Sequence, residues 1–285
     1  MRVGIIGLGL VGSAVSKRLG AAGHCVCGYD IAKPAREQAV RDGVHVKPDA
    51  AAVAAAASTL FLCLMDSADR RALLWGEQAL AAALQPRAVL LDISTARPED
   101  IVEDGKRLAE QGVRLVDVCL SGSSEVIGKG QALALVGDSK ANAPYRGLLE
   151  TFTKAQYFFD RPGEGNRMKL IVNMAFGLNR LALAETLGVA AKAGFDLHTV
   201  LDILKSGETY SACMDTKGPK MIAGVYEPPA ARLAQHAKDV GLVLELAQSV
   251  GARVPISETH LRLLGEVMAS GDGDLDNAAI FNAFQ

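Results

Sequence analysis

The chain has 285 residues, of which 49% are hydrophobic and 22% are charged, and its formal net charge is −2 at neutral pH. This length suits two domains, and the composition is that of a folded globular protein. Because there is neither a cluster of Lys and Arg nor an excess of positive charge, the composition argues against nucleic acid as a partner.

The N-terminal part of the chain alternates short β-type runs with helical segments, which is typical of a parallel sheet with helices on its faces. Strands are predicted at residues 2–6, 25–29, 60–64, 88–92, 114–119, 132–136 and 156–159. Helices are predicted at residues 11–22, 35–42, 50–57, 68–76 and 98–111. Pro34 and Pro98 fall in predicted first turns, where proline is tolerated.

The pattern becomes entirely helical after residue 162. A long helix is predicted at about 166–193, ending before Gly194, and others follow at 197–205, 211–221, 231–250 and 258–268. The sequence therefore predicts an α/β fold in two domains. Residues 1–162 are predicted to form a doubly wound parallel sheet, and residues 163–285 an all-α domain that begins with the long interdomain helix.

A glycine-rich motif directly follows the first predicted strand. Residues 7–12 read Gly7-Leu8-Gly9-Leu10-Val11-Gly12, a G-x-G-x-x-G pattern that opens a predicted helix. In this context the first glycine permits a tight turn, the second lets the backbone approach a pyrophosphate, and the third lets helix and strand pack closely. The motif predicts a dinucleotide-binding domain of the Rossmann type.

Asp30 ends the second predicted strand, close to where an acidic side chain binds the ribose hydroxyls of a dinucleotide. A carboxylate there repels a 2′-phosphate, so we favour NAD over NADP as the cofactor. Lys33 and Arg36 follow soon after and leave NADP open.

Three further turns fall at the carboxyl ends of predicted strands, where sheets of this kind bind ligands. The first contains Leu64 and Met65. The second contains Ser94 and Thr95, of which one hydroxyl can cap the next helix while the other meets a cofactor. The third is Ser121-Gly122-Ser123, which has the composition of an anion-binding nest or of a flexible loop.

Lys169 and Asn173 stand four positions apart in the long predicted helix, so their side chains point the same way, one turn apart. Their neighbours are mostly apolar, which predicts an enclosed helix, and a buried amine needs a partner or a chemical role. The alternative is a lysine that reaches the surface from a packed helix.

Nothing in the chain predicts a membrane or metal partner. Glycines come too early for a signal peptide, and no stretch approaches the roughly 20 uninterrupted apolar residues of a membrane helix, so we expect a cytoplasmic protein. Five cysteines without a C-x-x-C pair and five histidines without H-x-x-x-H spacing do not predict a metal site.

Taken in order, these motifs resemble the β-hydroxyacid dehydrogenase family, which includes 3-hydroxyisobutyrate dehydrogenases and tartronate semialdehyde reductases. The resemblance extends over essentially the whole chain. Besides the glycine motif, it rests on Asp92-x-Ser94-Thr95, Asp117-x-x-x-Ser121-Gly122 with Gly128 and Gly130, Gly163-x-Gly165-x-x-x-Lys169-x-x-x-Asn173, and Lys238-Asp239.

The resemblance implies an NAD(P)-dependent oxidoreductase that interconverts a small 3-hydroxy acid and its semialdehyde. It implies that Lys169 is the catalytic acid/base, that Asn173 helps to hold the substrate, and that Ser121, Gly122 and Ser123 bind the substrate carboxylate. The usual lysine pKa of about 10.4 is too high for a base at neutral pH, but burial and a nearby nicotinamide cation disfavour the ammonium form.

The resemblance also assigns cofactor contacts and an oligomeric state. Thr95 and Lys238 match positions that contact the cofactor around the nicotinamide, and Leu64 and Met65 match the backbone beside it. The family's helical domain mediates dimers or tetramers, so we expect a homo-oligomer.

Three departures from the family pattern leave the substrate open. Ser123 stands where the family often has glycine, Met65 where proline is common, and Val172 where a second asparagine is frequent. The family's substrates include 3-hydroxyisobutyrate, tartronate semialdehyde, succinic semialdehyde, glyoxylate, threonate-type sugar acids and sulfonated analogues.

Two alternative functions are open to a chain with these motifs. The first is an imine reductase, a class that shares the architecture but usually carries another residue where Lys169 stands. The second is a non-catalytic dinucleotide-binding oligomerisation module, which is expected to lack the lysine. Arg180 and Glu185, further along the same helix, are expected to form interdomain or intersubunit salt bridges rather than to belong to the site.

Overall fold

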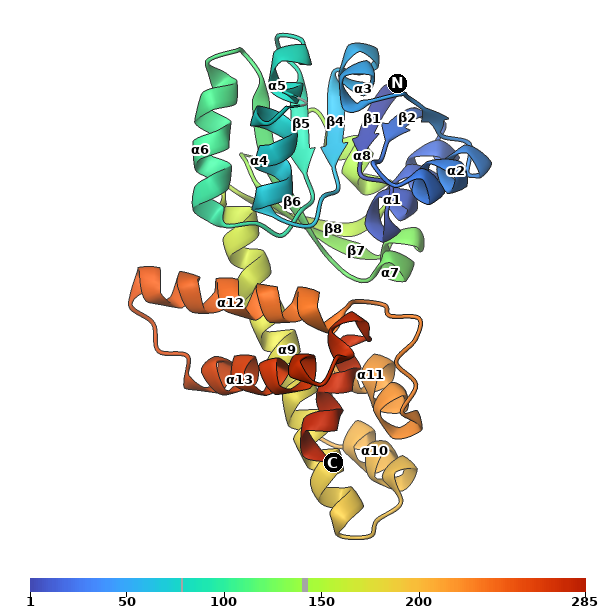
Figure 1. Cartoon of the computed structure of the whole chain (residues 1–285), viewed down its shortest axis with the longest axis vertical. Helices are drawn as coiled ribbons and strands as arrows, with labels where there is room; N and C mark the ends of the chain where they lie inside the picture. Colours follow the sequence, from blue (N-terminus) through green and yellow to red (C-terminus); the bar gives the residue numbers. More distant parts are fainter. Residues whose placement is uncertain (78, 140–142) are drawn as a thin grey trace. The chain divides into compact units, whose positions relative to one another are not determined.

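The computed structural model describes residues 1–77, 79–139 and 143–285 of the chain (Figure 1). It divides into two compact units, Met1–Lys169 and Leu170–Gln285, called unit 1 and unit 2 below. The division falls within the long helix α9, Glu164–Lys192, whereas the sequence prediction places it just before this helix. Each unit has hydrophobic core clusters of its own.

Unit 1 is built on one sheet with the strand order β3-β2-β1-β4-β5-β6-β7-β8. The strands are β1 (Arg2–Ile6), β2 (Cys25–Tyr29), β3 (His45–Val46), β4 (Thr59–Leu62), β5 (Val89–Asp92), β6 (Arg114–Ser121), β7 (Ala132–Gly137) and β8 (Thr153–Phe159). Neighbouring strands pair in parallel except β6 and β7, which pair antiparallel with Val118 opposite Val136. The order of β1 to β6 is that of the doubly wound dinucleotide-binding fold.

The predicted parallel sheet is correct for β1 to β6 and wrong for the β6–β7 pair. A parallel pair needs a crossover connection of about a dozen residues or more. Residues 122–131, which join β6 to β7, contain the short helix α7 (Ser124–Gly128), so the chain reverses direction and returns antiparallel. The two residues of β3 are too few to produce a sequence pattern, and that strand was not predicted.

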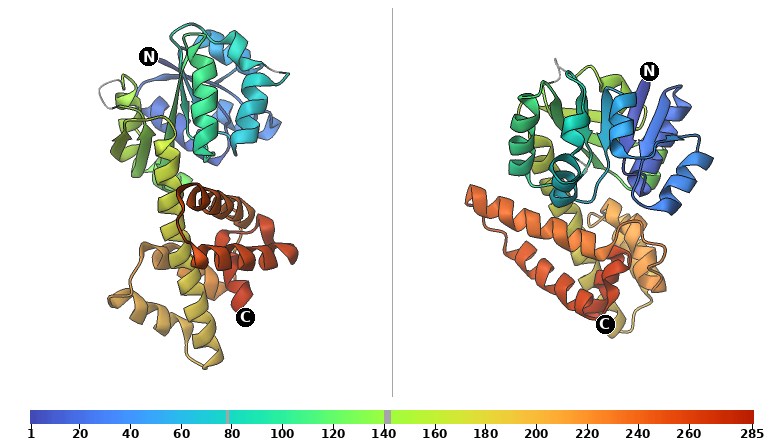
Figure 2. Two further views of the ribbon diagram at one scale, coloured as in Figure 1. Left: turned by 90° about the vertical axis from the view of Figure 1, so that its left-hand side faces the viewer. Right: turned by 45° about the horizontal axis from the view of Figure 1, so that its top comes forward.

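Helices cover both faces of this sheet (Figures 1 and 2). They are α1 (Leu10–Ala21), α2 (Lys33–Arg41), α3 (Ala50–Ala56), α4 (Ser67–Trp75), α5 (Leu80–Ala83), α6 (Pro98–Ala109), α7 and α8 (Arg146–Glu150). Successive strand residues enter opposite cores: Ile5 and Phe61 belong to one cluster, whereas Ile6 and Leu62 belong to the other. Burial on both faces explains why the strands read as continuous apolar runs.

Unit 2 is helical throughout its described elements. After α9 come α10 (Leu197–Ser206), α11 (Ala212–Ala223), α12 (Leu233–Val250), α13 (Pro255–Ala269) and the 3₁₀ helices η2 (Asp272–Asp274) and η3 (Asn277–Phe284). The four α-helices after α9 were predicted to within three residues at each end, but η3 was not. Ile280 and Phe281 of η3 are buried in the unit 2 core with Leu183 and Leu264.

The long helix α9 is less enclosed than its apolar sequence predicts. Ile171 is 47% exposed and Phe176 is 38% exposed. Judged by length and hydropathy alone, α9 is also a candidate membrane span, with 39% of the relevant window buried, but core helices of water-soluble proteins satisfy the same criteria and the indication is weak. A helix that is apolar on all sides does not reveal from its sequence which face is covered.

Two histidines lie side by side in the core of unit 2. His236 on α12 and His260 on α13 are 7% and 1% exposed, and their ring centroids are 5.1 Å apart. Burial, together with the charge of Arg180, lowers the pKa of His260 to about 4 and holds the pKa of His236 well below 6.5. Both rings are therefore neutral at pH 7.

We expect the protein to lose stability as the pH falls from 6.5 to about 4. A histidine with a depressed pKa in the folded state binds its proton more readily in the unfolded chain, so its contribution is fully present above pH 6.5 and is lost as the pH falls toward the folded value of about 4. For His260 the loss is up to about 3 kcal/mol. Urea unfolding at pH 7.0 and 4.5 measures it.

A pair of variants tests the assignment of this acid sensitivity. His260→Leu should show a smaller drop in the free energy of unfolding between the two pH values, whereas His198→Leu, at an exposed position of α10, should behave as the unchanged protein does. An undiminished drop in His260→Leu would show that the destabilisation arises elsewhere.

Candidate active site

The predicted cofactor residues of unit 1 lie where neighbouring parallel strands end. The order β1-β4-β5-β6 brings the carboxyl ends of these strands to the same edge of the sheet. The glycine turn follows β1, Leu64 and Met65 follow β4, and Thr95 follows β5. Ligands bind at this edge in doubly wound sheets.

The three glycines of the motif have three different surroundings. Gly7 has φ +93°, and a Cβ there would overlap the carbonyl oxygen of Cys63, while a Cβ at Gly12 would overlap the carbonyl oxygen of Gly7. Gly9 is exposed, and a Cβ built on it meets nothing within 4 Å. Gly9 is also the N-cap of α1, and because glycine has no side chain, no side chain at this position caps the helix. The turn thus presents open backbone at a helix N-terminus, which suits a phosphate.

Asp30 connects the glycine turn to the end of β2. Its carboxylate accepts hydrogen bonds from the backbone N–H of Leu8 at 2.6 Å and of Ala32 at 2.7 Å. Arg36 donates from Nη1 to the carbonyl oxygen of Asp30 at 2.6 Å and lies over the Tyr29 ring, 5.8 Å from its centroid. The open backbone at Gly9 and the carboxylate beside the turn fit a dinucleotide, with its pyrophosphate on residues 8–12 and its ribose at Asp30.

A buried network links the turns after β4 and β5. Asp92 accepts the backbone N–H of Ser94 at 3.0 Å, and the Ser94 hydroxyl accepts the backbone N–H of Leu64 at 3.2 Å. Asp92 also pairs with Arg70 at 2.8 Å, and both side chains are fully buried. The capping role predicted for Ser94 or Thr95 is wrong, because Arg97 occupies the N-cap of α6. The Ser94 hydroxyl instead links the turn after β5 to the turn after β4.

The segment Ser121-Gly122-Ser123 begins at the end of β6 and leads into the helix α7. Gly122 has φ +141°, and the Ser123 hydroxyl caps α7 by accepting the backbone N–H of Val126 at 3.4 Å. A hydroxyl that accepts one hydrogen bond still carries a proton to donate. Ser123 therefore combines a structural role with a donor that a carboxylate can use.

A buried aspartate fixes the start of α9. Asp117 on β6 accepts the backbone N–H of Gly163 at 2.9 Å and that of Asn166 at 2.8 Å. The Asn166 side chain in turn accepts the backbone N–H of Ala96 at 2.8 Å. A carboxylate at a helix N-terminus is favourable, although burial raises the pKa of Asp117. Lys169, which is half-buried, follows Asn166 by three residues on α9.

Asn166 belongs to no motif recognisable in the sequence, and Asp117 stands out there only as part of the family motif. A charged residue in the middle of a predicted buried strand was the available signal for Asp117, since such charges are rarely buried without partners. Asn166 carried no such signal, because a polar residue in the first turn of a helix is ordinary.

In unit 2, a second aspartate links two predicted site residues. Asn173 donates from Nδ2 to Asp239 at 2.9 Å, and Lys238 Nζ lies 3.2 Å from the other oxygen of Asp239. Asp239 is 8% exposed. In the sequence Asp239 stands out only as the neighbour of Lys238, and no pattern indicates that it would contact a residue 66 positions away.

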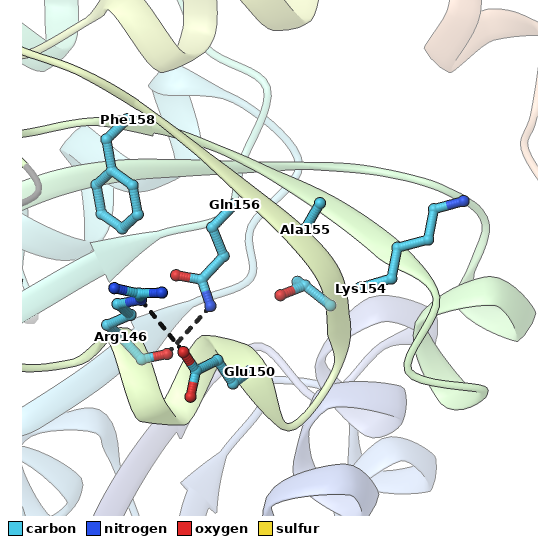
Figure 3. Close-up of a pocket in the computed structure, with 7 residues that line it drawn as sticks. Arg146, Glu150, Lys154, Ala155, Gln156 and Phe158 are labelled. Atoms are coloured by element: carbon cyan, nitrogen blue, oxygen red, sulfur yellow. Dashed lines mark hydrogen bonds and ion pairs between the residues drawn. The ribbon is translucent and has the colours of Figure 1, made fainter.

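Two pockets of unit 1 are lined by residues other than those predicted for the site. One, of about 140 Å³, lies beside α8 and β8, where Arg146 pairs with Glu150 at 3.2 Å and Gln156 donates to the Arg146 carbonyl (Figure 3). The other, of about 530 Å³, lies between α6 and β6. Neither contains a residue predicted for the site, so neither is assigned to its chemistry.

The glycine turn, the acidic residue after β2 and the strand order define a dinucleotide-binding domain, which is followed here by a helical unit. Residues 2–160 match the family model described as the NAD binding domain of 6-phosphogluconate dehydrogenase. Residues 163–284 match the model described as NAD-binding of NADP-dependent 3-hydroxyisobutyrate dehydrogenase. The chain belongs to the β-hydroxyacid dehydrogenase family, whose members use a nicotinamide dinucleotide.

Individual relatives are similar to this chain over almost its full length. Glyoxylate/succinic semialdehyde reductase 1 of Arabidopsis thaliana is 28% identical over 287 residues, which cover 99% of this chain and 98% of that protein. The cytokine-like nuclear factor N-PAC of Xenopus tropicalis is 26% identical over 99% of this chain, but the chain spans only about half (53%) of that protein. The crystal structure of 3-hydroxyisobutyrate dehydrogenase from Salmonella typhimurium has the same fold, with a TM-score of 0.91, 24% identity and 99% of both chains covered.

Proposed function

We propose that this protein interconverts a small 3-hydroxy acid and its semialdehyde with a nicotinamide cofactor, and that Lys169 is the general acid/base. The observation that carries the proposal is the fixed start of α9. Asp117 and Asn166 hold the first turn of that helix against β6 and the turn after β5, and Lys169 follows one turn later in the same unit as the cofactor turns. A catalytic lysine needs such positioning.

In the proposed mechanism, the chain's own residues bind the acid and move one proton. Ser121, Gly122 and Ser123 hold the substrate carboxylate through hydroxyl and backbone donors. Lys169 Nζ takes the proton of the substrate hydroxyl during oxidation and returns it during reduction. When bound, the nicotinamide supplies the hydride chemistry.

Asn173 is proposed to orient the reacting groups. Helix geometry places it one turn after Lys169 on the same side of α9. Because its Nδ2 donates to Asp239, its amide orientation is fixed, and its Oδ1 is the atom proposed to meet the substrate hydroxyl or the Lys169 ammonium. Asp239, which also lies 3.2 Å from Lys238 Nζ, is a positioning residue in this scheme. Lys238 is proposed to contact the cofactor because it matches the family motif.

An activity screen tests the proposal against its two alternatives. NADH and NADPH absorbance should be followed with a panel of small semialdehydes, 3-hydroxy acids and cyclic imines. Turnover of semialdehydes and 3-hydroxy acids supports the proposal, whereas turnover of imines alone supports the imine reductase. Dinucleotide binding without turnover of any compound supports the non-catalytic module, an outcome of interest because N-PAC aligns with the full chain.

We propose NAD as the preferred cofactor, because the Asp30 carboxylate lies at the glycine turn and repels a 2′-phosphate. The family model for residues 163–284, which is described as NADP-dependent, makes the test necessary. We expect Asp30→Asn to keep a hydrogen-bond acceptor for Leu8 and to lower the KM for NADP relative to that for NAD. Steady-state kinetics with both cofactors measure the ratio, and Asp202→Asn, an exposed change on α10, should leave it unaltered. An unchanged ratio in Asp30→Asn would remove this residue from cofactor selection.

We propose that the protein forms a homodimer or homotetramer through unit 2. Large apolar side chains are exposed on its helices and loops: Ile171, Phe176, Val189, Phe195 and Ile203. Large apolar side chains left exposed in such number favour an interaction surface on this unit. Light scattering after gel filtration should give a mass that is a multiple of the chain mass, and a monomer would contradict the proposal.

A further inference from the structure

Within the part of the chain that the structure describes, the core of unit 2 contains a buried cation for which no ion pair is seen. Arg180 on α9 is 1% exposed, and its Nε and Nη2 atoms have no hydrogen-bond partner among the described residues. Arg180 was predicted to form an interdomain or intersubunit salt bridge. That prediction is wrong among the described residues, because the side chain is buried in unit 2 and forms no ion pair there. Burial lowers the pKa of Arg180 to about 10, so the guanidinium is still charged at pH 7.

The carboxylate whose negative charge acts on Arg180, that of Asp276, is already occupied by other groups. Asp276 pairs with Lys217 at 2.7 Å and with Lys220 at 2.9 Å, and it also accepts the backbone N–H groups of Ala230 and Ala278. One carboxylate therefore serves two ammonium groups before Arg180 is considered. A buried charge without a partner is strongly destabilising, so this excess of positive charge calls for an anion.

Two further unpartnered polar atoms face the same stretch of α9. The Nε2 atoms of His236 and His260 are buried and have no hydrogen-bond partner among the described residues. A Cβ built on Gly177 would lie 2.8 Å from His236 Cε1 and 3.2 Å from His260 Cε1, so both rings turn this edge toward the helix at Gly177. Arg180 follows Gly177 by three residues and shares its side of α9.

The aromatic neighbour of Arg180 compensates its charge only in part. Cζ of Arg180 lies 5.9 Å from the centroid of the Phe176 ring. The face of a ring attracts a cation, but a cation–π contact at this distance leaves the N–H groups of the guanidinium without acceptors.

We propose that unit 2 binds one small monovalent anion, of the size of chloride, between Arg180 and the Nε2 atoms of His236 and His260. Arg180 supplies the charge and two N–H donors, and each neutral histidine that carries its proton on Nε2 supplies one more. The binding atoms are enclosed by side chains, which favours a monatomic ion over sulfate or phosphate. The anion is a structural component of the helical core and is independent of the cofactor site.

Crystals of the protein grown in sodium bromide test occupancy directly. We expect an anomalous bromide peak within hydrogen-bonding distance of Arg180 Nε or Nη2 and of at least one of the two Nε2 atoms. Density at this place that fits water and gives no anomalous signal in bromide would overturn the proposal, because buried water would then satisfy these donors.

Thermal unfolding tests the linkage of the anion to stability. With ionic strength held constant by sodium gluconate, raising chloride to about ten times its Kd should raise the Tm of the unchanged protein by about 3 °C. Arg180→Met should lose this response, whereas Arg262→Met, at an exposed position of α13, should keep it. An equal chloride response in Arg180→Met would overturn the proposal. If that variant does not fold, the bromide experiment on the unchanged protein decides the question.

Discussion

Replacement of Lys169 by alanine is expected to lower kcat by about 10²–10⁴-fold, the usual contribution of a positioned general acid/base. NADH affinity should be unchanged, because the proposed cofactor contacts come from the turns after β1, β4 and β5 and from Lys238. Steady-state kinetics with the best substrate of the panel and NADH fluorescence titration measure the two quantities. Addition of a small primary amine should restore part of the activity, because a free amine can replace the missing proton carrier.

The matched control is Lys192→Ala, which removes an exposed lysine at the far end of the same helix and should leave kcat unchanged. Near-normal turnover in Lys169→Ala would exclude this residue as the acid/base. Loss of activity together with loss of NADH binding would instead indicate a damaged cofactor domain, and the amine would then have no effect.

Gly165→Ala is expected to affect stability and catalysis together, although Gly165 touches neither substrate nor cofactor in the proposed site. Its Cβ would lie 2.5 Å from the carbonyl oxygen of Leu135 and 2.8 Å from Asp117 Oδ2. Because these are backbone and buried atoms, α9 must move away from the sheet, at a cost of about 1–3 kcal/mol in the free energy of unfolding. A displacement of about 1 Å at Lys169 can cost about 10² in rate.

Urea unfolding and kcat measure the two effects of Gly165→Ala. The matched control is Gly20→Ala, also within a helix, where a Cβ meets nothing within 4 Å and alanine should stabilise the protein by about 0.5–1 kcal/mol. If Gly165→Ala kept full stability and full activity, the close packing of α9 against Asp117 would not be what positions Lys169.

Local pattern was sufficient for most of the fold. The strands of unit 1 alternate with helices in an order that the sequence displays, and the glycine motif fixes the turn after β1. The two predictions that failed, the direction of β7 and the burial of α9, have a common cause. The direction of β7 depends on the length of the connection before it, and the burial of α9 depends on which neighbours cover it. Neither is a property of a short window of sequence.

The candidate site divides in the same way. The sequence identified Lys169, Asn173 and the residues of the turns because each belongs to a recognisable motif, and their roles remain predictions for the experiments above. It did not show that Asn166 meets the turn after β5, or that Asp239 meets Asn173. These partners are 70 and 66 residues apart, so only the packing of the chain brings them together.

The sequence by itself determined the order of the elements, the dinucleotide turn and the family. Periodicity, glycine spacing and motif order can all be seen in the sequence without knowing how the chain packs. Only the tertiary structure decided which polar side chains are enclosed and what each one meets. Arg180 is the clearest case: in the sequence it is an ordinary helical arginine, and in the fold it is a charge in the core of unit 2. Burial turns a solvated group into one that requires a partner, and burial is set by all the neighbours at once.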